Sequence, residues 1–123
     1  KSLRLSDLVN ENEEIRVTAM EFAIIDGESD IDSESYNEIT AEQKNDIINL
    51  LQNYSYRRTV FTAFSDGSMS DLGNAVVYIY TYGNGKLNNT VCVSAAGDVS
   101  INGKNYVLAD ASEFIQELLE IIN

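Results

Sequence analysis

AVVYIYTY, residues 75–82, carries the strongest strand signal in the chain. β-branched and aromatic residues favour strands, and this stretch contains little else. Because side chains alternate along a strand, Val77 and Ile79 share one face. The other face carries a bulkier set, namely Val76, Tyr78, Tyr80 and Tyr82. We therefore expect a strand with one core face and one aromatic face, around which the other strands are arranged.

The residues that follow predict further short strands joined by turns. GNGKLNN, residues 83–89, is expected to be a turn or loop, and TVCVSAA, residues 90–96, a strand. Two more strands are expected at 99–101 and 104–109. The NG pair at 102–103 between them is the best hairpin signal, since a type I′ turn needs positive φ at both central residues.

Upstream of residue 75 the sequence predicts two more strands. IRVTAMEFAII, residues 15–25, is rich in β-formers and ends at a turn-prone DG. DGESDIDSES follows, and we interpret its residues 26–34 as an acidic loop that Ile31 pins to the core. YSYRRTVFTAF predicts a strand at about 56–64, and residues 65–74 have the composition of a loop.

Two segments have the periodicity of amphipathic helices. At residues 41–53 the apolar positions recur at helical spacing, and Thr40 with Gln43 forms a capping-box pattern. DASEFIQELLEIIN, at the end of the chain, has a strong apolar stripe. There, Asp110 and Glu113 are expected to be the N-cap and its reciprocal partner.

The expected order is therefore β-α-β-β-β-β-β-α. Sequential strands joined by short turns pair antiparallel, and amphipathic helices need an apolar face to cover. We expect an α+β fold in which an antiparallel meander sheet carries both helices on one face. We expect residues 1–123 to form a single domain, in which 1–14 is an extended arm or a segment next to an anchor.

Composition excludes several functional classes. The chain has 8 basic and 20 acidic residues, a net charge of -12, so it would be repelled by nucleic acids and by anionic membranes. It contains no His, which is the usual general base near neutral pH and the usual transition-metal ligand. No stretch approaches the roughly 18–20 apolar residues of a membrane span. The sequence implies no cofactor.

The acidic run resembles a calcium loop at some positions and departs from one at others. An EF-hand loop places ligands at positions 1, 3, 5, 7, 9 and 12 and Gly at position 6. Counted from the first Asp, the odd positions are Asp26, Glu28, Asp30, Asp32 and Glu34. Ile31 takes the place of the Gly and Asn37 that of the final Glu. A calcium-responsive domain that uses Asp26, Asp30, Asp32 and Glu34 therefore remains an alternative to a solvated loop.

Enzymatic chemistry has little support in the sequence. Two carboxylates facing each other across a cleft would suit a hydrolase, and an acidic chain provides such pairs by chance. Cys92, the single cysteine, stands between two valines with no His to activate it. We predict that the protein is not an enzyme, with a two-carboxylate hydrolase as the lesser alternative.

The aromatic face is the best candidate for a binding surface. Tyr78, Tyr80 and Tyr82 share one strand face, and tyrosines of this kind either contact a partner or simply suit a half-exposed strand. Arg58 belongs to the only adjacent pair of arginines and is expected nearby. This pair could form ion pairs with the acidic loop, which is the more economical interpretation, or it could anchor an anionic ligand. The ligand would be an unknown protein or a component of the cell envelope.

The second half of the chain also resembles a known family. The matching residues are Tyr56, Arg57 and Thr59, followed by Asn102, Gly103, Lys104 and Tyr106. They resemble segments of uncharacterised small domains from cell-surface lipoproteins of Gram-positive gut bacteria. The resemblance implies an extracytoplasmic location, with an anchor upstream of Lys1, and assigns no activity. Together with the aromatic face, it predicts a non-enzymatic binding module of a bacterial surface protein.

Overall fold

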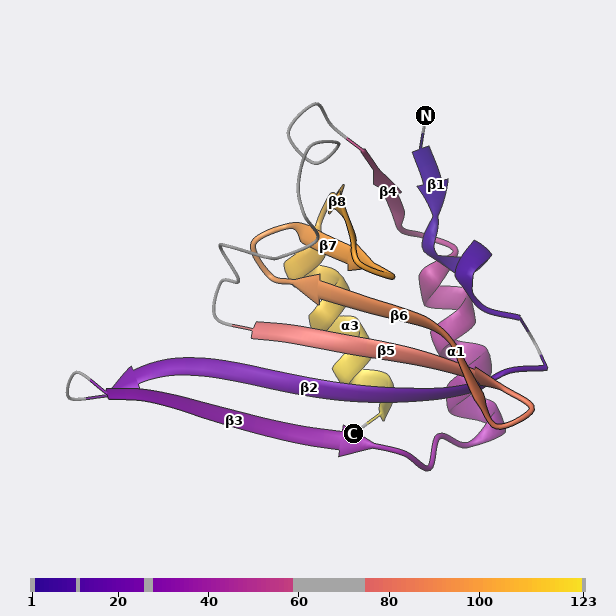
Figure 1. The fold of residues 1–123 in the computed structure, drawn as a ribbon, viewed down its shortest axis with the longest axis horizontal. Helices are drawn as coiled ribbons and strands as arrows, with labels where there is room; N and C mark the ends of the chain where they lie inside the picture. Colours follow the sequence, from indigo (N-terminus) through magenta and orange to yellow (C-terminus); the bar gives the residue numbers. More distant parts are fainter. Residues whose placement is uncertain (1, 11, 26–27, 59–74, 123) are drawn as a thin grey trace.

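The computed structural model describes residues 2–10, 12–25, 28–58 and 75–122, and gives the backbone alone for residues 2, 22–25 and 28–32. Within these residues a single antiparallel sheet has the strand order β1-β4-β8-β7-β6-β5-β2-β3. Both helices lie on one face of it (Figure 1). The structure therefore confirms the α+β fold that the sequence predicts.

The elements have the following bounds. The strands are β1 (Ser2–Arg4), β2 (Glu14–Ile25), β3 (Glu28–Tyr36), β4 (Ser55–Arg57), β5 (Ala75–Gly83), β6 (Lys86–Ser94), β7 (Asp98–Ile101) and β8 (Lys104–Leu108). The helices are α1 (Ala41–Leu51) and α3 (Ala111–Ile122), and a 3₁₀ turn, η1 (Leu5–Leu8), follows β1.

The core lies between the sheet and the two helices. Val77 and Ile79 of β5 are almost fully buried there, as expected from the alternation in their strand. Phe114 and Leu118 of α3 and Ile47 of α1 pack against this inner face of the sheet. We call the opposite face, which the helices leave uncovered, the outer face (Figure 1).

The N-terminus of α1 is capped as predicted, whereas that of α3 is not. The Thr40 hydroxyl accepts a hydrogen bond from the Gln43 amide at 3.1 Å, and the Gln43 side chain accepts one from the Thr40 amide at 3.0 Å. Asp110, by contrast, has φ of 58°. An N-cap residue normally has an extended backbone, so the predicted capping box at Asp110 and Glu113 is wrong in its backbone geometry.

Two NG turns form tight hairpins, and one of them was predicted from the sequence. Asn102 and Gly103 join β7 to β8 with φ of 51° and 87°, which confirms the prediction. Asn84 and Gly85 have nearly the same backbone, with φ of 53° and 78°. The expected loop at 83–89 is therefore wrong beyond these two residues, because β6 already begins at Lys86.

The acidic run is a strand and not a connecting loop. Residues 28–36 form β3, which pairs with β2 along its whole length in an antiparallel hairpin. The DG pair expected to form a turn, Asp26 and Gly27, lies outside the described residues. The far end of the hairpin extends past both helices (Figure 1). Asp and Ser are depleted in strands, but at the edge of a sheet solvent replaces the second neighbour and they are tolerated.

The N-terminal residues are part of the domain and do not form a free arm. β1 pairs with β4, and Leu5 is 1% exposed in the core. The Leu5 amide donates a hydrogen bond to the Tyr54 carbonyl at 3.1 Å. Of the strand predicted at about 56–64, the structure shows Ser55–Arg57 as β4. The remainder from residue 59, and the loop predicted at 65–74, lie outside the described residues.

Candidate functional site

Tyr78, Tyr80 and Tyr82 lie together on the outer face of β5, and we refer to them as the tyrosine row. Their side chains are half-buried, whereas the intervening Ile79 and Thr81 are fully buried on the helix side. The rings of Tyr78 and Tyr80 are parallel, at 7°, with centroids 6.2 Å apart. The structure thus confirms that the three tyrosines share one face, and their use by a ligand stays a prediction.

Hydrogen bonds hold the row in place from the neighbouring strands. The Tyr78 hydroxyl donates to the Cys92 sulfur on β6, and Tyr80 accepts from Thr18 on β2. The Thr18 hydroxyl also lies 3.1 Å from the hydroxyl of Ser35 on β3. Burial raises the pKa of both tyrosines, with smaller contributions from nearby groups, so both hydroxyls remain protonated at neutral pH.

Arg16 supplies the positive charge at one end of the row. Its guanidinium lies 4.4 Å from the centroid of the Tyr82 ring, a cation–π contact. Its ion pair with Glu14 is long, at 3.5 Å, and exposed. Arg16 was not among the residues predicted from the sequence, although strand alternation is enough to infer its position. Arg16 and Thr18 alternate with the core residue Val17, which places Arg16 on the outer face.

Arg58, the arginine expected beside the row, lies elsewhere. Its guanidinium is 5.8 Å from the centroid of Tyr106, which itself contacts the buried Tyr56 at 4.9 Å. Tyr106 pairs with Val99 and packs against the core on the helix side of the sheet. Three strands, β8, β7 and β6, separate β4 from β5 in the sheet. The predicted grouping of Arg58 with the tyrosine row is therefore wrong.

The proposed calcium ligands lie along an extended edge strand. Asp30 and Asp32 are in β3, opposite Ala23 and Glu21, and Glu34 is opposite Ala19. Asp26 lies outside the described residues. Alternate positions of a strand are about 7 Å apart, whereas calcium ligands converge at about 2.3–2.6 Å from one ion. In the part of the chain that the structure describes, no three acidic or Cys side chains cluster as a metal site.

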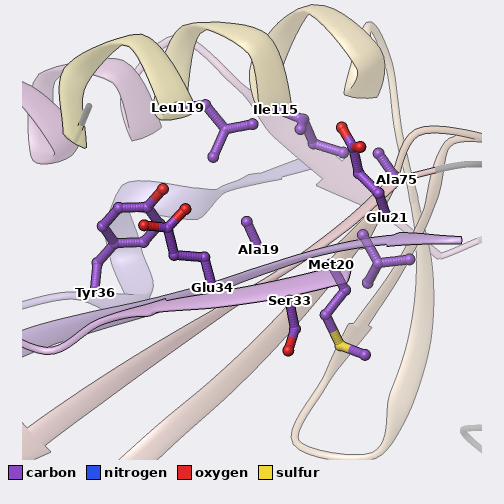
Figure 2. Close-up of a pocket in the computed structure, with 10 residues that line it drawn as sticks. Ala19, Met20, Glu21, Ser33, Glu34, Tyr36, Ala75, Ile115 and Leu119 are labelled. Carbon is purple, nitrogen blue, oxygen red and sulfur yellow. The ribbon is translucent and has the colours of Figure 1, made fainter. Parts of the chain in front are cut away.

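A groove of about 320 Å³ lies between α3 and the β2–β3 hairpin, on the inner side of the sheet (Figure 2). Ile115 and Leu119 of α3 form one wall, and Ala19 of β2 forms the floor. The small side chain of Ala19 leaves this space open, whereas Ile15 and Val17 fill the core at the two preceding inner positions of the same strand.

Carboxylates stand at both ends of this groove. Glu34 and Tyr36 of β3 lie at one end, and Glu21 lies at the other, near Ala75 (Figure 2). Burial raises the pKa of Tyr36, and the hydrogen bond that its hydroxyl donates to Glu34 raises it further. The carboxylate of Glu34 is thereby fixed beside the groove.

The two glutamates do not have the setting that a hydrolase requires. Glu21 and Glu34 are both exposed to solvent. General acid catalysis by a carboxyl group needs an apolar setting that keeps one of the pair protonated at neutral pH. The groove therefore contains two carboxylates without the burial that would assign them different roles.

A buried carboxylate, Glu13, was missed because nothing distinguishes it from its acidic neighbours in the sequence. It is 5% exposed and accepts hydrogen bonds from the Asn10 amide at 2.7 Å and the Asn88 side chain at 2.6 Å. Burial alone would raise its pKa, but these hydrogen bonds and one from Thr81 outweigh burial and lower it. Glu13 therefore joins the N-terminal segment to the β5–β6 hairpin.

Comparison with known proteins adds no relative. The chain matches no protein-family model, no curated protein and no solved structure. The resemblance to bacterial surface domains therefore stays a prediction. Neither α1 nor α3, the helices of the described residues, is long and apolar enough to cross a membrane.

Proposed function

We propose that this chain is a non-enzymatic binding module whose tyrosine row contacts the ligand. The observation that carries the proposal is the position of the row. Three aromatic side chains stand half-exposed on the face of the sheet that the two helices leave uncovered. Tyrosines combine a large apolar area with a polar hydroxyl and few rotatable bonds, which makes them effective contact residues.

The surroundings of the row support binding over simple strand packing. Thr18 and Thr90 are short hydroxyl side chains on the two strands that flank β5, opposite Tyr78 and Tyr80, and Ser35 lies beyond Thr18 on β3. They add hydrogen-bonding groups without covering the rings from above. Arg16 adds a guanidinium that can orient an acceptor group of the ligand. A protein or a cell-envelope component with apolar area and hydrogen-bonding groups would fit this surface.

The proposal includes an extracytoplasmic location. This part is supported by the resemblance of the segments around Tyr56 and Asn102 to domains of bacterial surface lipoproteins. The residues encoded upstream of Lys1 test it, since a signal peptide or a lipidation site there would agree with it and a cytoplasmic fusion partner would contradict it.

The test is a triple substitution of the tyrosine row by serine, Tyr78→Ser, Tyr80→Ser and Tyr82→Ser. The immobilised wild-type domain should capture a saturable ligand from a cell-envelope extract, and the triple variant should lose at least about tenfold in affinity for it. Tyr36→Phe is the matched control, because it alters a tyrosine on the helix side. Circular dichroism should show that all three proteins are folded. Equal capture by the triple variant and the wild type would contradict the proposal.

A further inference from the structure

We propose a second docking site that goes beyond the tyrosine row: the free edge of β3 and the groove beside it bind an extended, lysine-bearing segment of a partner protein. The lysine side chain would lie in the groove between α3 and the β2–β3 hairpin, with its ammonium group at Glu34. Three features of the described residues carry this inference, namely the groove lining, the charge at its ends and the unpaired edge next to it.

The lining of the groove fits an unbranched aliphatic chain with a charged end. Ala19, Ile115 and Leu119 offer apolar contact along its length, and no Lys or Arg is among the described residues that line it. Lysine side chains bury their methylene groups against such surfaces and keep the ammonium in contact with water or an anion. The open volume of about 320 Å³ is ample for one such side chain.

The charges at the groove select a cation. Glu34 and Glu21 provide a carboxylate at each end, and Tyr36 holds the Glu34 carboxylate by a hydrogen bond. The net charge of -12 for the whole chain adds a long-range attraction for cationic groups. A flexible ammonium can bind an exposed carboxylate from several directions, whereas a guanidinium needs a planar, two-point fit.

The edge of the sheet supplies the backbone contact. β3 is the last strand of the sheet among the described residues, so its outer backbone groups have no neighbouring strand. Extended peptides bind such edges by adding a strand, and alternate side chains then fall on the same face of the sheet. A lysine opposite Glu34 in an added strand would therefore point to the same face of the sheet as Glu34, which is the face where the groove lies.

The same charges argue against a second copy of this chain as the occupant. β3 carries acidic residues at every second position, Glu28, Asp30, Asp32 and Glu34. Two such strands placed edge to edge would bring like charges opposite one another, which is destabilising. A partner with lysines at alternate positions would instead place opposite charges next to this strand.

The experiment uses a fluorescent peptide of about eight residues in which lysine alternates with threonine, a length typical of a strand. We expect anisotropy to show saturable binding to the wild-type domain. Glu34→Gln should weaken binding by about tenfold, which is the loss of affinity expected when one charged contact is removed. Ala19→Leu fills the groove without changing any charge and should weaken binding by a similar factor. Backbone amides of residues 33–36 should gain protection from hydrogen exchange when the peptide binds.

Glu120→Gln is the matched control, because it removes one charge from an exposed position of α3 that does not line the groove. It should leave the affinity within about twofold of the wild type. Equal losses in Glu120→Gln and Glu34→Gln would mean that net charge alone attracts the peptide, and would overturn the proposal. Unchanged binding by Ala19→Leu, or tighter binding of an arginine–threonine peptide, would overturn the role of the groove.

The two proposed sites can be tested separately. The triple serine variant of the tyrosine row should bind the lysine peptide as the wild type does, and Glu34→Gln should retain capture of the ligand of the tyrosine row. Loss of lysine-peptide binding in the triple variant, with the fold intact, would contradict a distinct site at β3.

Discussion

Glu13 shows how a single carboxylate can join distant parts of this chain. Its two oxygens accept hydrogen bonds from Asn10, three residues away, and from Asn88, which belongs to β6. A Cβ at Gly83 would lie 2.7 Å from the Asn88 side-chain nitrogen, so a larger residue there would displace the Asn88 side chain from this contact. A tightly hydrogen-bonded, buried carboxylate of this kind stabilises the fold only while it is ionised.

Replacing Glu13 by Gln should therefore destabilise the protein. The amide cannot accept at both positions, and a buried donor left without an acceptor costs about 1–3 kcal/mol. Urea denaturation at pH 7 measures the free energy of unfolding of both proteins. Glu14→Gln is the control, since Glu14 is exposed and its long pair with Arg16 is worth little. Equal stability of the wild type and Glu13→Gln would contradict the role of this carboxylate.

The pH dependence of stability gives a second measurement of Glu13. Its pKa in the folded state lies below the ordinary value of 4.5. The stabilisation is therefore complete above about pH 4.5 and is lost as the pH falls through the folded pKa. The difference in unfolding free energy between the wild type and Glu13→Gln should shrink as the pH is lowered from about 5 into the acid range below the ordinary pKa of Glu13. A constant difference over this range would show that ionisation of Glu13 does not matter.

At the scale of elements, the central strand and both helices are predictable from sequence, whereas the edge of the sheet is not. The alternating side chains of β5 and the apolar stripes of α1 and α3 indicate directly which residues are buried, since each element has one face toward the core. β3 has no such signal because, among the described residues, only β2 pairs with it. Its alternating acidic residues and serines therefore have the composition of a loop, and only pairing with β2 makes them a strand.

The candidate site is likewise predictable from the sequence only in part. The shared face of Tyr78, Tyr80 and Tyr82 is a consequence of strand periodicity and could be inferred from the sequence. The positions of Arg16 and Arg58 depend on which strands are neighbours, and that information is tertiary. The groove depends on a small residue, Ala19, facing the turn of α3 that carries Ile115 and Leu119, which no local pattern reveals.

The hairpin between β5 and β6 provides a test of turn chemistry at the level of one element. Gly85 has φ of 78°, and a Cβ there would meet no atom within 4 Å. Gly85→Ala should therefore destabilise the protein by about 1 kcal/mol through backbone strain alone. Asn84→Gly is the control and should change the stability by less than about 0.5 kcal/mol, because Gly tolerates the same conformation. Thermal unfolding of the three proteins measures both effects.

At the scale of the whole molecule, the two ends of the sheet are protected in different ways. β1 ends the sheet with a three-residue strand, too short to recruit a neighbour. β3 ends it with a nine-residue strand, which without charge would be a template for self-association. The alternating acidic residues of β3 supply that charge. The same charges that repel a second copy would attract a lysine-bearing strand.

Removing the charges of β3 should therefore promote self-association. In the variant Glu28→Gln, Asp30→Asn, Asp32→Asn and Glu34→Gln, the edge keeps its backbone groups and loses its like-charge repulsion. Size-exclusion chromatography and light scattering should show larger species that grow with protein concentration.

The matched control carries Glu42→Gln, Asp46→Asn, Glu113→Gln and Glu120→Gln, which remove the same four charges from exposed helix positions. This protein should elute as the wild type does, because its edge strand is unchanged. Equal association of the two variants would mean that net charge, and not its placement on β3, keeps the molecules apart. If the edge variant alone associates, the acidic residues of β3 prevent self-association at the one long strand edge that the described fold leaves open.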